Sequence, residues 1–268
     1  MFTAEGIAEL VREIRKEHGL PESPFKIDEV RYESEGDKLF IIAHDRTDKS
    51  VVIGNSLVIG KLRERLGVRQ VTVYSNLDLE IKREKLEEAE KLVEGTELEF
   101  LLPIIDAEKR FPPRKWPEVK GNVMTLVFLS FSAKPLLGFS KRLGLPHEAV
   151  GLKYTFPRLN YEPIEGNLRE LFYPDEAKLA EIAEERNREL VLADFPFSFK
   201  ERGGVYFLNP FRLLHIGFFE LKYLFGFEFP TMVDKVELLR FVAEMTYKGL
   251  MESTDGAKIV WRYWRKGK

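Results

Sequence analysis

A proline-rich segment near the middle of the sequence constrains the fold more than any other feature. Residues 111–117 read FPPRKWP, and prolines at this density block both helix formation and sheet pairing. We therefore predict a linker over residues 103–120, with one folded part before it (1–102) and another after it (121–268). The charges differ too: residues 1–102 hold 16 basic and 22 acidic side chains, and residues 103–268 hold 26 and 22.

The first part shows a short α+β pattern. Apolar residues recur at helical spacing over residues 4–18, and Gly19 ends this helix. Two segments that alternate as strands follow, and the turn-forming residues E-G-D separate them. The elements predicted for this part are strands over 26–34, 38–44, 70–75 and 98–105, the last of which runs slightly past residue 102, and helices over 56–66 and 80–94.

The second part has the rhythm of a doubly wound α/β domain. Residues 123–129 form a continuous apolar run of strand length, which is typical of a central parallel strand covered on both faces. An alternation of helices and strands follows it and indicates a parallel sheet with crossover helices. The predicted elements are helices over 136–143 and 174–188 and strands over 149–154 and 189–193.

Composition excludes several kinds of chemistry. The chain has no cysteine, which removes disulfides, thiolate metal sites and cysteine nucleophiles. Its four histidines are too dispersed for a metal site, and we expect none. No apolar run reaches the roughly 20 residues of a membrane helix, and the first helix does not resemble a signal peptide. We expect a cytoplasmic protein without membrane partners, and the many charged residues suggest a thermophilic source.

The N-terminal order of elements and the stretch DKSVVIGNSLVIGKLRERLGVRQVTVYS resemble a type II KH domain over residues 4–76. In that family a G-x-x-G loop between two helices admits an RNA or single-stranded DNA backbone, and helix N-termini supply N–H donors to phosphate. The resemblance implies RNA contact at Gly54, Asn55, Ser56, Lys61, Arg63 and Arg65, with Lys49 and Arg69 nearby.

Leu57 departs from the KH pattern, because it stands where the second glycine belongs. We expect its side chain to crowd the path of the nucleic acid and to disfavour the positive φ that glycine allows. An alternative therefore stays open, in which this part keeps the fold as a structural module without binding RNA.

Residues 121–194 resemble the core of the PP-loop ATP pyrophosphatase superfamily, through the segment LVFLSFSAKPLLGFSKRLGLPHEAVGLKY. There the family's S-G-G-x-D-S loop grips the pyrophosphate of ATP. Here the loop reads SFSAKP, so both glycines are gone, Phe131 should project a ring and Pro135 removes an amide donor. The resemblance leaves Ser130, Ser132 and Lys134 as weak nucleotide-binding residues, with a plain strand-to-helix turn as the alternative.

A second signature of related tRNA-modifying enzymes is also altered. The segment NPFRLL corresponds to their N-P-C-x-x-C motif and carries Phe211 and Leu214 instead of the cysteines. We therefore expect no catalytic residue and no required cofactor.

The C-terminal third is rich in aromatic residues, which we expect in the core or at an interface with a second copy or a protein partner. Residues 259–266 read IVWRYWRK, a composition suited either to stacking on a single strand or to an edge strand packed on the core.

The element pattern predicts an α/β protein. The two resemblances imply an archaeal-type, RNA-associated accessory protein, with tRNA as the expected RNA and a non-catalytic nucleotide-binding domain. One alternative is an active RNA-modifying enzyme that uses ATP and Mg²⁺ with a divergent loop. Another is a structural or oligomerisation protein without a ligand.

Overall fold

The structure of the chain is a computed structural model that describes residues 2–34, 36–110, 116–225, 235–247, 251 and 253–265. The chain divides into two compact units, Met1–Glu84 and Lys85–Lys268. This division lies inside helix α4 (Asn76–Val93), whereas the sequence suggested a boundary after residue 102. Residues 111–115 of the expected linker lie outside the described residues.

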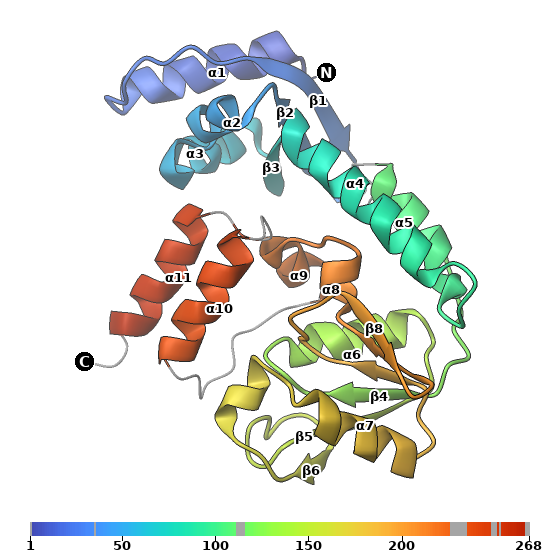
Figure 1. The fold of residues 1–268 in the computed structure, drawn as a ribbon. Coiled ribbons are helices and arrows are strands. Elements are labelled where there is room, and N and C mark those ends of the chain that lie inside the picture. The colour runs from blue at the N-terminus through green and yellow to red at the C-terminus, as the bar shows by residue number, and fades with distance from the viewer. Residues whose placement is uncertain are drawn as a thin grey trace. The chain divides into compact units, whose positions relative to one another are not determined.

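The N-terminal unit is a three-stranded sheet with helices (Figure 1). The central strand β2 pairs antiparallel with β1 and parallel with β3. The strands predicted over 26–34, 38–44 and 70–75 are confirmed, as are the helices over 4–18 and 56–66. In order the elements are α1 (Ala4–Glu17), β1 (Ile27–Glu33), β2 (Lys38–Ala43), α2 (Arg46–Ile53), the 3₁₀ turn η1 (Gly54–Ser56), α3 (Leu57–Leu66) and β3 (Gln70–Ser75).

Apolar periodicity explains how this unit closes its core. Ile7, Val11 and Ile14 recur at helical spacing on α1 and are buried. The hydroxyl of Thr3 caps the same helix by accepting a hydrogen bond from the backbone N–H of Gly6 (3.1 Å). Strand β2 reads KLFIIA, and every residue after Lys38 is buried, as its central position requires.

The second unit is built on a six-stranded, mostly parallel sheet of order β6-β5-β4-β7-β9-β8, in which only β8 runs antiparallel to its neighbour. The predicted mixed α/β class with a parallel sheet is thus confirmed. The strands are β4 (Thr125–Phe128), β5 (His147–Leu152), β6 (Glu162–Ile164), β7 (Leu190–Leu192), β8 (Phe199–Arg202) and β9 (Val205–Leu208).

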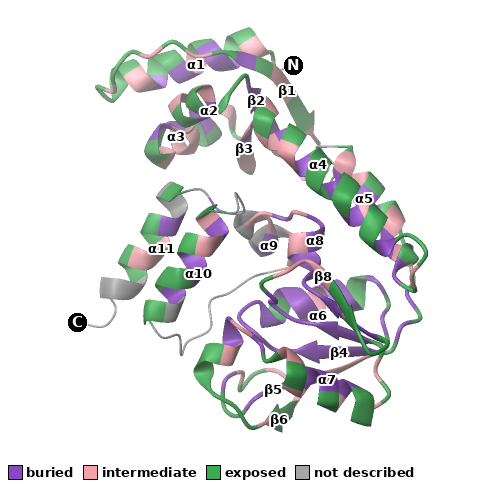
Figure 2. Ribbon diagram, in the orientation of Figure 1, coloured by how far each residue is buried: buried purple, intermediate pink, exposed green. Residues whose placement is uncertain are grey.

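Helices cover both sides of this sheet: Figure 1 shows α6 and α7 on opposite sides of β4. Figure 2 shows β4 and much of α6 in the colour of buried residues, while β8 is largely exposed at the edge. The helical elements are α4, η2 (Glu99–Leu101), α5 (Leu102–Lys109), α6 (Ala133–Arg142), η3 (Leu168–Leu171), α7 (Glu176–Glu185), α8 (Pro210–Leu213), α9 (Phe218–Phe225), α10 (Lys235–Tyr247) and α11 (Ser253–Arg265).

The structure differs from the sequence analysis in three places. Residues 98–105 are helical rather than a strand, because their apolar side chains recur at helical spacing and Leu98, Leu101 and Ile105 enter the core of the second unit. The sequence reading also missed the β8–β9 hairpin, which Gly203 and Gly204 close with positive φ. The edge strand that was one alternative for residues 259–266 is contradicted, because residues 259–265 belong to α11.

Candidate functional site

The first candidate site lies at β4, where the order in which the chain adds strands to the six-stranded sheet reverses. From β4 the chain passes through α6 to β5 on one side, and β7 later pairs with the other side of β4. In open α/β sheets, ligands bind outside the carboxyl ends of the strands at such a point. Ser130 lies just beyond β4 and Asp194 just beyond β7, so both occupy the position where a ligand is expected.

Asp194 binds the turn between β4 and α6. Its Oδ2 accepts hydrogen bonds from the Ser130 hydroxyl (2.7 Å) and from the backbone N–H of Ser132 (2.6 Å). The Asp194 backbone N–H donates in return to the Ser130 hydroxyl (3.0 Å). All three residues are buried, with Asp194 only 7% exposed. The Asp194 carboxylate therefore accepts the hydrogen bonds that the Ser130 hydroxyl and the Ser132 N–H could otherwise donate to a ligand at the start of α6.

Burial raises the pKa of Asp194 above its ordinary range. Hydrogen bonds from Ser130 and Ser132 and the charge of Arg212 act in the opposite direction, but desolvation is the largest effect. Arg212 lies on α8 and donates to Glu244 Oε1 on α10 (2.7 Å), while its buried Nε has no hydrogen-bond partner among the described residues. Burial of the turn is thus the main reason for the raised pKa of Asp194.

Phe131 fills the interior of the same turn. Its ring is 1% exposed and packs on Phe172 and Phe241, with centroids 5.0 and 4.3 Å away. The prediction that this ring projects from the loop is therefore wrong, because Phe172, directly after η3, and Phe241 of α10 enclose it. Of the residues predicted to bind nucleotide, Ser130 and Ser132 are buried against Asp194, whereas Lys134 is exposed on α6, so they share no open surface.

Sequence reasoning missed Asp194, although a signal was present. The residue directly follows the predicted strand 189–193, and the carboxyl ends of parallel strands meet at one edge of a sheet. An acidic residue there was therefore a natural partner for Ser130. The segment after β9 is structural: Asn209 caps α8 by accepting from the backbone N–H of Phe211 (3.2 Å), and it donates to the Phe195 carbonyl (2.9 Å).

The second candidate site is the turn between α2 and α3. Gly54, Asn55 and Ser56 have φ of 50°, 54° and 69°, so three successive residues are left-handed. A Cβ on Gly54 would lie 2.1 Å from Cγ2 of Val58, which requires glycine there. Leu57 instead has φ −72° as the first residue of α3 and is 40% exposed. The prediction that this position calls for positive φ is wrong, because the left-handed residues precede it.

The cations near this turn differ in their availability. Lys61 pairs with Glu64 (2.8 Å), and Arg65 pairs with Glu17 and, at 3.5 Å, with Glu13. Arg63 is exposed on α3. Exposed pairs are worth little and give way to a stronger anion. These three residues therefore keep their charge accessible, in contrast to Lys49.

Lys49 is buried and belongs to the fold rather than to a surface. Its Nζ lies 2.9 Å from Asp78 Oδ2, and Asp78 and Ser75 cap the start of α4 through reciprocal backbone hydrogen bonds. Burial raises the pKa of Asp78, but the charge of Lys49 and the hydrogen bonds from Lys49 and Ser75 outweigh it and lower the pKa.

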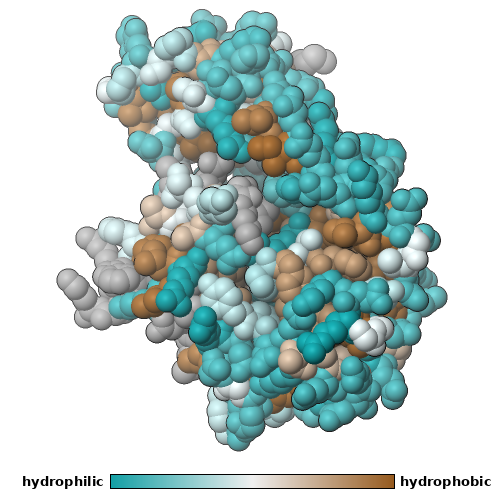
Figure 3. All heavy atoms as spheres, in the orientation of Figure 1, coloured by the Kyte–Doolittle hydropathy of each residue, from teal (hydrophilic) through white to brown (hydrophobic). Residues whose placement is uncertain are grey.

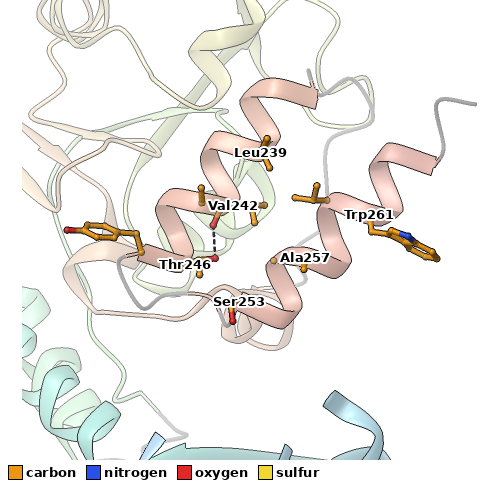
Figure 4. Close-up of a pocket in the computed structure, with 10 residues that line it drawn as sticks. Leu239, Val242, Thr246, Ser253, Ala257 and Trp261 are labelled. Carbon is orange, nitrogen blue, oxygen red and sulfur yellow. Dashed lines mark hydrogen bonds between the residues drawn. The ribbon is translucent and has the colours of Figure 1, made fainter. Parts of the chain in front are cut away.

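A groove of about 990 Å³ separates α10 from α11 (Figure 4). Its lining is mostly apolar, and Figure 4 shows the Trp261 ring pointing away from α10. Leu239, Tyr247 and Trp261 are 46%, 90% and 59% exposed. Figure 3 accordingly shows apolar side chains gathered over these two helices. Phe227 and Phe229, which were expected in the aromatic core or interface, lie outside the described residues.

Among the described residues, no group of acidic, histidine or cysteine side chains could hold a metal ion. None of the described helices combines the length and apolar character needed to cross a membrane. No protein family, curated protein or solved structure matches the chain. The chemistry of the two turns is therefore the basis for a functional assignment.

Proposed function

We propose that this protein is an RNA-associated accessory protein, in which a KH-like N-terminal unit contacts RNA and a PP-loop-like second domain has lost catalysis. The KH resemblance is supported by the order α1-β1-β2-α2-η1-α3-β3, which places the sequence GNSL between two helices. The doubly wound resemblance is supported by the reversal of strand order at β4.

The observation that carries the RNA proposal is the geometry of the α2–α3 turn. Three left-handed residues bring the chain into α3, and the side chain of the N-cap residue Ser56 forms no capping hydrogen bond with that helix, although the Leu57 N–H donates to the Gly54 carbonyl. The N–H groups at a helix start attract phosphate through hydrogen bonding and the helix dipole. Asn55 is exposed beside these donors, and Arg63 is exposed in the last turn of the same helix.

The second domain supports a non-catalytic role. A phosphate at the start of α6 would need the Ser132 N–H and the Ser130 hydroxyl, and both already donate to Asp194. The buried Phe131 ring also occupies the interior of the turn. ATP would have to displace a carboxylate and a packed ring, so turnover of ATP is not expected.

Filter binding of a single-stranded RNA at low salt tests the RNA proposal. We expect weak, salt-sensitive binding by the wild-type protein, because the unit holds few accessible cations. Arg63→Glu should reduce the affinity about tenfold or more, since it replaces attraction with repulsion near the phosphate. Arg83→Glu makes the same charge change at an exposed position on α4 and serves as the matched control.

Two outcomes would end the RNA proposal: no RNA affinity in the wild-type protein, or an equal loss in both variants. The alternative of an active ATP-dependent enzyme has its own test. Calorimetric titration with ATP and Mg²⁺ should give no heat from the start of α6, and heat that disappears in Ser132→Pro, which lacks the N–H, would favour the enzyme.

The alternative of an interface with a second copy keeps one specific observation in its favour. The groove between α10 and α11 exposes Leu239 and Trp261. If a second copy docks there, Trp261→Ser should shift the mass measured by light scattering from dimer to monomer. A wild-type monomer at all concentrations would remove this alternative.

A further inference from the structure

A second hollow of about 740 Å³ lies beside α6, within the size range of small-molecule sites. We call it the α6–β5 groove. It is lined by Leu137 and Lys141 of α6, by His147 of β5, and by Arg158, Tyr161 and Glu162 in and just before β6.

The groove lies at the opposite end of the sheet from Asp194. Lys141 is in the last turn of α6, and His147 and Glu162 are the first residues of their strands. These positions belong to the amino ends of β5 and β6, whereas Ser130 and Asp194 follow the carboxyl ends of β4 and β7. The groove is therefore separate from the β4–α6 turn, and the α2–α3 turn belongs to the other unit.

The acidic side chains along the groove are already neutralised. Glu148 pairs with Arg188 (2.8 Å) and with Arg186, and Glu162 pairs with Arg186 (2.8 Å). Burial raises the pKa of Glu148, but the hydrogen bonds and charges of the two arginines outweigh it and lower the pKa. The lowered pKa keeps Glu148 ionised, and both glutamates are paired with Arg186 or Arg188.

The basic side chains of the groove, in contrast, are in surplus. Lys141 and Arg158 are exposed, and neither forms an ion pair with any described residue. His147 is half-buried, with Nδ1 3.0 Å from the carbonyl oxygen of Leu145. A carbonyl can only accept, so Nδ1 carries the proton and the ring is held in one orientation. Two full positive charges and an oriented imidazole thus line one hollow.

Apolar side chains line the same groove beside the basic ones. Leu137 and the ring of Tyr161 line the groove, and the Tyr161 hydroxyl donates to the Leu152 carbonyl (3.1 Å), which holds the ring in place. A ligand with a doubly charged head and a flat or apolar body would use both the basic and the apolar lining residues. Lysine holds phosphate as a point charge, and arginine can bind two of its oxygens at once.

We propose that the α6–β5 groove binds an organic phosphate, with the phosphate at Lys141 and Arg158 beside His147 and an apolar or aromatic body against Leu137 and Tyr161. The phosphate has two sources of equal chemistry, a free nucleotide-sized molecule or an RNA strand. The site requires neither turn to be functional.

Calorimetric titration of the full chain with AMP, inorganic phosphate and adenosine tests the site. AMP should bind more tightly than inorganic phosphate, because only AMP also contacts the apolar side chains of the groove, and adenosine should bind at least about tenfold more weakly than AMP. The double substitution Lys141→Gln and Arg158→Gln should weaken AMP by about tenfold or more, since it removes both charge-assisted contacts. Lys200→Gln on β8, at the other edge of the sheet, is the control and should leave binding unchanged.

Unchanged melting temperatures will show that the variants fold, since Lys141, Arg158 and Lys200 are all exposed. The proposal is overturned if AMP gives no heat at millimolar concentration, or if AMP binds equally well to the double variant. A short single-stranded RNA added to the AMP complex distinguishes the sources. Displacement of AMP by RNA assigns the phosphate to a strand, and retention of AMP assigns it to a free molecule.

Discussion

The α2–α3 turn and the β4–α6 turn were both expected to bind phosphate, but they differ in whether a side chain of the protein already accepts hydrogen bonds at the turn. At the first, three left-handed residues leave the start of α3 without a side-chain cap. At the second, Asp194 takes the donors and Phe131 fills the interior. Loss of glycine alone does not explain this difference, since Asn55 and Ser56 adopt positive φ without being glycine. What distinguishes the turns is whether the protein supplies its own anion.

The largest expected effect comes from removing that internal anion. Asp194→Ala should lower the free energy of unfolding by about 2–4 kcal/mol, because the Ser132 N–H and the Ser130 hydroxyl would be left buried without an acceptor. Urea denaturation measures this change. Added sulfate should raise the melting temperature of the variant more than that of the wild type, since an external anion can take the vacated donors.

A change below about 0.5 kcal/mol, or no difference in the response to sulfate, would break the comparison between the turns. Asp194→Asn is the matched control, because its amide oxygen still accepts a hydrogen bond while the charge is gone.

The stability of the α2–α3 turn should be nearly as sensitive to substitution, but for a steric reason. Gly54→Ala should cost about 2–3 kcal/mol, because alanine must adopt φ near 50° and its Cβ would overlap Val58. Gly19→Ala is the control: it also has positive φ, but no atom lies within 4 Å of the added carbon. Equal losses in urea denaturation would show that backbone strain alone matters and that the contact with Val58 does not.

The β4–α6 turn should also make the free energy of unfolding depend on pH, through Asp194. The pKa of Asp194 is higher in the folded than in the unfolded chain, so the folded state keeps its proton over a window above the ordinary value of about 3.9. Its contribution to stability is complete below that value and is lost as pH rises through the folded pKa.

Comparison of Asp194→Asn with the wild type isolates this effect from other titrating groups. The stability of the variant relative to the wild type should rise with pH by about 1.4 kcal/mol for each unit of pKa elevation. Urea titrations from about pH 4 upward measure it, and a difference that stays flat or falls with pH would contradict the raised pKa of Asp194.

The sequence predicted what periodicity encodes and missed what depends on contacts distant in the chain. The strands over 26–34, 38–44 and 70–75 follow from local alternation, and the apolar run 123–129 sufficed to identify the central strand β4. The role of Lys49 could not be read locally, since it depends on Asp78 in another helix. The closure of the β4–α6 turn likewise depends on Asp194, which lies 64 positions from Ser130.

The smallest expected effects come from glycine substitutions in the α2–α3 turn, and they test which of its residues are left-handed. A KH-like interpretation of the sequence alone assigns the missing glycine to Leu57, whereas the backbone assigns left-handed conformation to Asn55 and Ser56. Leu57→Gly should therefore cost about 0.5–1 kcal/mol, because glycine replaces a helical residue of α3. Asn55→Gly should instead be neutral or stabilise by up to about 0.5 kcal/mol, since glycine relieves positive φ but has more freedom in the unfolded chain. Urea denaturation of the two variants should give opposite signs or a clear gap. If Leu57→Gly stabilised the protein and Asn55→Gly did not, the left-handed residues would lie elsewhere in the turn, and the uncapped start of α3 would lose its role as the phosphate contact.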